Sequence, residues 1–220
     1  MNFGLGKLDQ LGRKYGTDKS TAKNLPPTRE GYLARSANGH GYTLIYEKYF
    51  SGLRKKPVQM LEIGVLEGDS LTMWKEYFPI GMIHGLDIDP DCKKYEEDRI
   101  KIYVGNQIDE GVLRQICQNV PDGFDIIIDD GSHYAQHIIK SFCFLFPYLK
   151  SNGFYVIEDL DCASCETWGA VPHNRGMELY HESHGNSIGN MEGFLKCLAV
   201  DEQIKEVKIH SKKICFVLKK

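Results

Sequence analysis

From Val58 onward, short apolar runs rich in Val, Ile and Phe alternate with longer segments in which apolar residues recur at helical spacing. This alternation is typical of βαβ units, because two parallel strands of one sheet need a crossover between them, which is usually a helix. Five strands are expected, at Val58–Ile63, Met82–Asp87, Ile100–Val104, Phe124–Ile128 and Gly153–Glu158. The sequence therefore predicts an α/β fold with a doubly wound, mostly parallel, Rossmann-like sheet.

The C-terminal part of the chain departs from this alternation. A helical pattern around Met191–Val200 is followed by two strand-like runs, Ile204–Ile209 and Ile214–Leu218, with a polar turn at His210–Lys213 between them. Two strands joined by a short turn run antiparallel. We therefore expect a C-terminal antiparallel hairpin on one edge of the sheet.

Before Val58 the pattern predicts two short amphipathic helices, one around Leu8 and one around Tyr46. A stretch rich in Gly, Pro and Asn, Ser20–Gly41, separates them, and Asp161–Gly189 has a similarly irregular pattern. Both stretches are interpreted as loops that could cover an active site. The predicted organisation is residues 1–57 as N-terminal helices with a lid-like loop, followed by residues 58–220 as the main domain.

Composition excludes several classes of protein. With 220 residues, 42% hydrophobic and 26% charged, the chain has the composition of a globular domain. A net charge of -3 offers no electrostatic footprint for nucleic acid, and no apolar run approaches the ~20 residues of a membrane span. The first residues do not resemble a secretion signal, so we expect a cytoplasmic protein whose seven cysteines are free thiols.

One motif lies where the first predicted strand turns into its helix. Glu62 is followed by glycines at 64 and 68, which permit a close approach of the backbone to a ligand, and Asp87 comes 19 residues after Gly68. An acid at that spacing is typical of sites that bind ribose hydroxyls. Leu66 and Asp69 interrupt the G-x-G-x-x-G pattern of dinucleotide sites. The motif favours a nucleoside-type cofactor over a purely structural turn.

A second group of residues follows the fourth and fifth predicted strands. Asp129, Asp130 and His133 come after one strand, and Glu158 and Asp159 after the next. Because ligands of open α/β sheets bind outside the carboxyl ends of the strands, these side chains should converge. Carboxylates packed together repel one another unless a cation compensates them, and Mg²⁺ prefers such oxygen ligands. Helix capping is the alternative, but it does not explain acidic pairs on two strands.

Together these motifs resemble those of the class I S-adenosylmethionine-dependent methyltransferases, and specifically of the metal-dependent sugar O-methyltransferases of macrolide biosynthesis. The resemblance covers most of the chain. Its motifs are Tyr15–Lys19, Leu61–Val65, Ser70–Lys75, Tyr77–Pro79, Asp125–His133 and Val156–Leu160.

The resemblance implies S-adenosylmethionine and Mg²⁺, or another divalent metal, as cofactors. It implies Asp130, Glu158 and Asp159 as metal ligands and His133 as the general base. The residues expected on the cofactor side are Glu62, Gly64, Gly68, Asp87, Asn106, Gln107 and Asp129. The implied substrate is a small, glycosylated natural product, methylated on a hydroxyl of a sugar or other vicinal diol, and relatives tend to form homo-oligomers.

The expected chemistry has a physical basis. Methyl transfer from a sulfonium needs an aligned oxygen nucleophile, and a sugar hydroxyl is too weakly acidic to supply one at neutral pH. A metal ligand lowers the pKa of such a hydroxyl and orients it. His133 is expected to take the proton, as the only histidine beside the predicted metal ligands.

Other interpretations remain open at this stage. The acceptor could be a phenol, a catechol or an amine. The chain could also be an NAD-dependent oxidoreductase, which the missing dinucleotide motif disfavours, or a binding module without catalysis, which the intact acidic motifs disfavour. Cys162 and Cys165 lack the partners of a zinc site and are expected to be free thiols. His181 and His184 are one residue too close for a zincin motif. The residues considered for a lid are Tyr42, Trp168 and His173.

Overall fold

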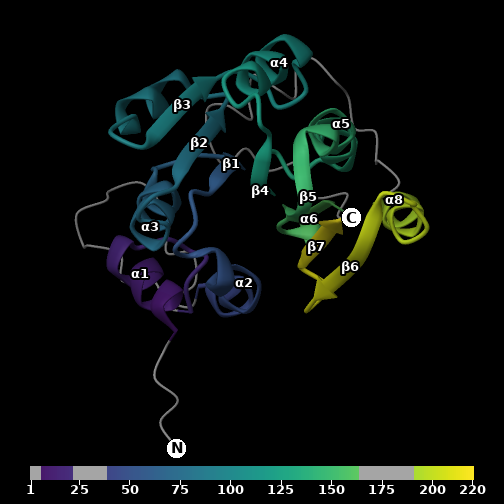
Figure 1. Ribbon diagram of the computed structural model, residues 1–220, viewed down its shortest axis with the longest axis horizontal. Coiled ribbons are helices and arrows are strands. Elements are labelled where there is room, and N and C mark those ends of the chain that lie inside the picture. Colours follow the sequence, from purple (N-terminus) through teal and green to yellow (C-terminus); the bar gives the residue numbers. More distant parts are fainter. Residues whose placement is uncertain (1–5, 22–38, 164–190) are drawn as a thin grey trace, which may run out of the picture.

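The computed structural model describes residues 6–21, 39–163 and 191–220. Its centre is a seven-stranded sheet with the order β3-β2-β1-β4-β5-β7-β6 (Figure 1). The strands are β1 (Gln59–Ile63), β2 (Met82–Asp87), β3 (Ile100–Val104), β4 (Phe124–Asp129), β5 (Leu149–Ile157), β6 (Ile204–His210) and β7 (Ile214–Lys219). Strands β1 to β5 are parallel to one another, whereas β7 is antiparallel to both β5 and β6. The predicted doubly wound sheet and its C-terminal hairpin are confirmed.

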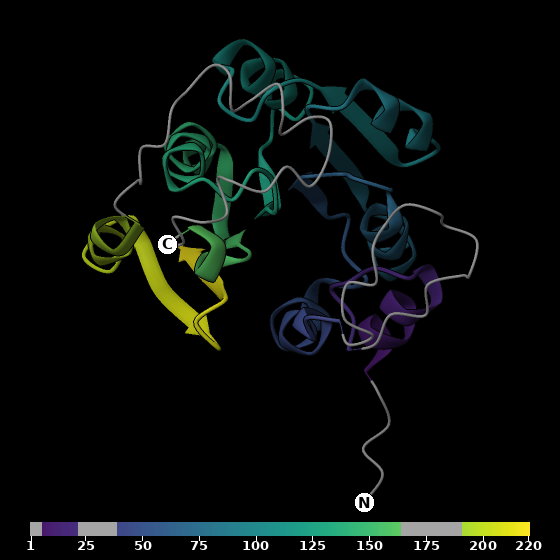
Figure 2. The same ribbon diagram turned by 180° about the vertical axis from the view of Figure 1, so that it is seen from behind.

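Helices cover both faces of the sheet. One face carries α1 (Lys7–Tyr15), α2 (Tyr42–Phe50) and α3 (Asp69–Tyr77), and the other carries α4 (Glu110–Gln118), α5 (Ala135–Leu145) and α8 (Met191–Leu198). The other helices of the described residues are short: α6 (Leu160–Ala163) and 3₁₀ helices at Ser51–Leu53, Pro90–Tyr95 and Phe146–Tyr148. The view from behind in Figure 2 shows the β6–β7 hairpin at the end of the sheet opposite β3.

The central strand β4 shows why its sequence is a continuous apolar run. Ile126 and Ile128 are buried in the cluster under α1, α2 and α3, whereas Ile127 is buried in the cluster under α4 and α5. Successive side chains of a strand point to opposite faces, so a strand covered on both faces needs apolar residues at every position.

The N-terminal helices belong to the same core as the sheet. Leu8 of α1 and Phe50 of α2 are fully buried in the cluster that also contains Trp74 of α3. Buried Asp9 ties the two helices together, because its carboxylate accepts hydrogen bonds from the Thr43 hydroxyl at 2.6 Å and the Thr21 amide at 2.8 Å. Thr21 is thereby held against α1.

Some element boundaries differ from the prediction. β5 begins at Leu149, four residues before the predicted Gly153, because Leu149 pairs with Phe124 and a register shift then accommodates the polar residues that follow. Helix α8 ends at Leu198, and the exposed Val200 lies beyond it.

Several sequence-based expectations fall outside the described residues. They concern most of the two proposed lid segments, Cys165 and the side chain of Cys162, the histidines His181 and His184, and the lid candidates Trp168 and His173. The five cysteines described in detail are free thiols: Cys92, Cys117, Cys143, Cys197 and Cys215. Among the described helices, none has the length and apolar character needed to cross a membrane.

Candidate active site

The predicted site residues meet because three neighbouring strands end at the same level. Ile63 of β1 lies opposite Asp129 of β4, which in turn lies opposite Ile157 of β5. The backbone amide of Asp130 donates to the Ile63 carbonyl at 3.0 Å, and that of Glu158 donates to the Asp129 carbonyl at 3.0 Å. The glycine loop and both acidic motifs therefore leave the sheet side by side.

Asp130, His133 and Asp159 form a compact group of possible metal ligands. One ligand atom from each of these half-buried side chains lies within 4.8 Å of the others, and His133 Nε2 is 4.0 Å from Asp159 Oδ2. His133 and Asp159 adopt positive φ values of 59° and 51°. Such conformations carry a cost that is often accepted at functional sites. The two carboxylates fit a small divalent cation that keeps open positions for other ligands, and the imidazole lies beside them.

Glu158 is adjacent to this group in the chain and is more deeply buried. Its side chain is 2% exposed, and its Oε1 accepts a hydrogen bond from the buried Tyr46 hydroxyl. Its Oε2 lies 2.9 Å from the ammonium of Lys19. Burial, together with repulsion from Asp130, raises the pKa of Glu158 well above its usual value. The structure thus places Glu158 among protein partners, next to the group formed by the other two acids.

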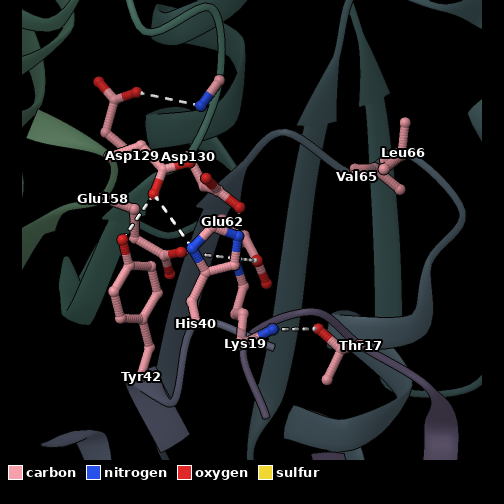
Figure 3. A network of polar contacts seen from close by, with 12 residues as sticks. Thr17, Lys19, His40, Tyr42, Glu62, Val65, Leu66, Asp129, Asp130 and Glu158 are labelled. Carbon is pink, nitrogen blue, oxygen red and sulfur yellow. Dashed lines mark hydrogen bonds and ion pairs between the residues drawn. The ribbon is translucent and has the colours of Figure 1, made fainter. Parts of the chain in front are cut away.

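Lys19 is the main site residue that sequence reasoning missed. Its side chain is 2% exposed, and its Nζ forms ion pairs with Asp130, with Glu158, and with Glu62 at 3.3 Å (Figure 3). Burial alone would lower the pKa of Lys19, but the three carboxylates outweigh burial and raise the pKa well above normal. The ammonium is therefore charged. The only sequence signal was its position within the motif Tyr15–Lys19.

Asp159 receives contacts from the start of α2. The Tyr42 hydroxyl donates to Asp159 Oδ1 at 2.6 Å, and His40 Nδ1 lies 3.8 Å from the same oxygen. Burial acts to raise the pKa of Asp159, but His133, the hydrogen bond from Tyr42 and His40 together hold it below its usual value. The expectation that His133 is the only histidine beside the acidic motifs was wrong, because the backbone before α2 brings His40 there as well.

The glycines of the first motif meet neighbouring parts of the chain. Gly64 has a φ of 94°, and a Cβ at this position would lie 2.1 Å from the carbonyl oxygen of Asp130. Gly68 has a φ of 73°, and a Cβ there would lie 2.8 Å from Cγ of Tyr95. Both glycines are therefore required by the protein's own packing, which brings the loop close to the acidic motif.

Asp87 contacts this loop directly, as its spacing in the sequence indicated. Its Oδ2 accepts hydrogen bonds from the amides of Val65 at 2.7 Å and Leu66 at 2.9 Å, and its Oδ1 accepts one from the Asp89 amide at 2.9 Å. A carboxylate oxygen can accept about two hydrogen bonds, so Oδ1 retains capacity for a ligand.

Glu62 is fully buried beneath the loop. Its Oε2 accepts a hydrogen bond from the Trp74 indole at 2.8 Å, whereas its Oε1 has no hydrogen-bond partner and faces Lys19. Burial raises the pKa of Glu62 to about 7, and the charge of Lys19 opposes this shift. A buried carboxylate oxygen without a hydrogen bond is rare, and it can serve as an acceptor for a bound ligand.

Gln107 and Asp129 brace the turn that carries the acidic motif. The Gln107 amide nitrogen donates to both carboxylate oxygens of Asp129, at 3.1 and 3.2 Å, and its oxygen accepts from the Ser132 amide at 2.8 Å. Asp129 is 1% exposed and also accepts a hydrogen bond from the Ser141 hydroxyl at 2.5 Å. Asn106 accepts a hydrogen bond from the Ile108 amide at 3.1 Å. Gln107 and Asp129 thereby hold the turn after β4 in place.

Comparison with known proteins extends this picture. No protein-family model matches the chain. Over 98% of its length the chain superimposes, with a TM-score of 0.69 and 33% sequence identity, on the MycE methyltransferase of the mycinamycin pathway solved with Mg and SAH. An O-methyltransferase from Bacillus cereus is 12% identical and superimposes over 100% of the chain with a TM-score of 0.54. The chain has the class I methyltransferase fold.

Curated relatives resemble the chain more closely in sequence. A tetracenomycin-C 3'-O-methyltransferase of Streptomyces olivaceus, which acts on a rhamnosyl derivative, is 40% identical over 170 residues. Mycinamicin VI 2''-O-methyltransferase of Micromonospora griseorubida is 37% identical over 171 residues. Each match covers 74% of this chain but only 42% and 41% of the respective relative, and the chain covers 55% of MycE. The chain thus spans about half the length of the relatives that it resembles.

Proposed function

We propose that this chain transfers a methyl group from S-adenosylmethionine to a sugar hydroxyl of a glycosylated small natural product, in a reaction that depends on a divalent metal. The observation that carries the proposal is the group formed by Asp130, His133 and Asp159 beside the glycine loop that Asp87 braces. The names of the curated relatives, which are sugar O-methyltransferases, support the acceptor class.

The cofactor is assigned to the loop after β1. Asp87 would hold the ribose hydroxyls through its remaining acceptor capacity. Glu62 Oε1, which pairs with Lys19 but accepts no hydrogen bond, would accept one from the cofactor's ammonium group. Gly64 and Gly68 shape the loop, while Asn106, Gln107 and Asp129 border the same edge of the sheet. MycE, which is similar in fold and sequence, was solved with SAH bound.

The metal is assigned to Asp130 and Asp159, with Glu158 as the third acid of the site. A bound divalent cation would lower the pKa of the acceptor hydroxyl. His133 Nε2, 4.0 Å from Asp159 Oδ2, would accept the hydroxyl proton, and the negative charge of Asp159 would stabilise the protonated imidazole. Tyr42 fixes the Asp159 carboxylate through its hydrogen bond to Oδ1.

A direct assay tests this proposal. The purified chain is incubated with isotopically methyl-labelled S-adenosylmethionine, Mg²⁺ and three acceptor classes: rhamnosylated polyketides, a catechol and a primary amine. Mass spectrometry should locate the label on the sugar. Label on the catechol or the amine alone would contradict the acceptor class, and failure of SAH to bind in calorimetry would contradict the cofactor.

A further inference from the structure

The ammonium of Lys19 lies at the meeting point of the cofactor loop and the acidic motifs. Glu62 comes from β1, Asp130 follows β4 and Glu158 follows β5, yet all three carboxylates pair with the same nitrogen. Glu62 is 0% exposed and Glu158 is 2% exposed, so water cannot compensate either charge. Within the described part of the chain, Lys19 is the one basic residue whose side chain forms ion pairs with all three carboxylates.

The burial of these charges means that the carboxylates need a compensating cation. An ionised carboxylate removed from water is costly unless a cation or several hydrogen bonds compensate it. Lys19 brings one positive charge to three carboxylates, and a fourth, Asp159, lies beside Asp130 in the group of possible metal ligands. The cluster therefore contains more acidic groups than Lys19 alone can pair, and a second cation can compensate those that ionise.

The backbone around Lys19 is held in place by hydrogen bonds. The Lys19 carbonyl accepts a hydrogen bond from the Thr43 amide at 2.9 Å, and the Asp18 carbonyl accepts one from the His40 amide at 2.7 Å. A lysine ammonium is a compact charge on a flexible stem. It can therefore shift among the carboxylates without movement of the backbone.

We propose that Lys19 is the resident counter-cation of the metal site: its ammonium compensates the acid cluster in the metal-free chain and shares Asp130 and Glu158 with a bound divalent cation. The proposal rests on the metal site of the proposed function. Lys19 and the metal then repel each other, so the lysine lowers metal affinity while it keeps the metal-free site folded. Lys19 is a positioning residue in this account.

The test is Lys19→Met, which keeps the length of the side chain and removes its charge. The metal-free variant should unfold about 6 to 20 °C below the wild type in a thermal scan, because one partner of a buried ion pair is left alone. MgCl₂ should recover much of this loss, while NaCl at equal ionic strength should not. Calorimetry should show Mg²⁺ binding at least about tenfold tighter than in the wild type. An unchanged or weaker Mg²⁺ affinity, or a loss of stability that Mg²⁺ does not recover, would overturn the proposal.

Two further variants complete the design. Lys14→Met removes a lysine whose ammonium pairs with the partly exposed Glu76 at 2.5 Å, away from the acid cluster. It should shift the unfolding temperature by less than about 4 °C, with no Mg²⁺-dependent recovery. Should Lys19→Met not fold, the double variant Lys19→Met/Glu158→Gln removes one charge of each sign. It should fold without metal, and failure to fold would count against the proposal.

The outcomes separate this inference from the proposed function. Mg²⁺ binding by Lys19→Met but not by the wild type would support Lys19 as the counter-cation and contradict a metal-dependent wild-type enzyme. Mg²⁺ binding by the wild type without tighter binding by the variant would retain the metal site and reject the role of Lys19.

Discussion

Replacement of Asp87 by alanine tests the cofactor site most directly. The carboxylate accepts three backbone amide hydrogen bonds, from Val65, Leu66 and Asp89, so it shapes the loop after β1 even without a ligand. If it also binds ribose hydroxyls, Asp87→Ala must affect both the stability of the chain and its affinity for the cofactor. The two effects can be measured separately.

The structure sets the expected magnitudes. The amide of Leu66 bonds to Asp87 in an exposed position, so water can replace the carboxylate there. We therefore expect the free energy of unfolding to fall by about 1 to 2 kcal/mol, which corresponds to ~2 to 8 °C in unfolding temperature. The lost hydrogen bonds to ribose should weaken SAH binding by a further ~1.5 to 3 kcal/mol, or about 10- to 150-fold.

Calorimetry with SAH, at a temperature where both proteins are folded, provides the assay. Asp125→Ala is the matched control, because Asp125 also accepts a backbone amide hydrogen bond, from Gln59 at 2.8 Å, but does so where β1 begins, at the opposite edge of the sheet. The control should lose stability and keep its SAH affinity within about threefold. An unchanged affinity in Asp87→Ala, or an equal loss in both variants, would refute a direct role of Asp87.

Three other predictions concern the base, the metal and the core. His133→Ala should lower kcat by about 10²-fold or more with SAH affinity nearly intact, whereas His40→Ala should lower kcat less than about tenfold. If steady-state kinetics show the larger loss of kcat in His40→Ala, the proton transfer belongs to His40. Exhaustive chelation should abolish methyl transfer and Mg²⁺ should restore it, so activity that survives chelation would contradict a metal held by Asp130 and Asp159. Burial, with a smaller effect of a nearby lysine, lowers the pKa of His84 to about 4. The folded protein thus resists protonation of His84, and stability should fall as pH drops from 6.5 to 4. Relative to His84→Gln, the wild type should lose about 3 kcal/mol more over that range in denaturant titrations, and identical pH profiles would contradict this account.

Much of the fold was readable from the sequence, because the relevant signals are local. The apolar run at Ile126–Ile128 indicated a strand covered on both faces, and the structure buries all three residues. Where local signals conflicted, the prediction was less accurate: the polar residues after Leu149 concealed the first part of β5, which pairing with Phe124 stabilises. The acidic motifs were also correctly placed, since residues that follow adjacent parallel strands must meet at one edge of the sheet.

The partners of those acidic motifs were decided by the tertiary structure alone. Lys19 reaches Asp130 and Glu158 across 111 and 139 residues of sequence, and no periodicity or spacing encodes a contact over that distance. Glu158 and Asp159 are neighbours in the chain, yet Glu158 pairs with Lys19 whereas Asp159 lies next to His133. The positive φ of Asp159 turns the backbone between the two side chains. Sequence patterns specify which side chains a strand presents at its end, whereas the pairing of buried charges depends on which distant segments the hydrophobic core brings together.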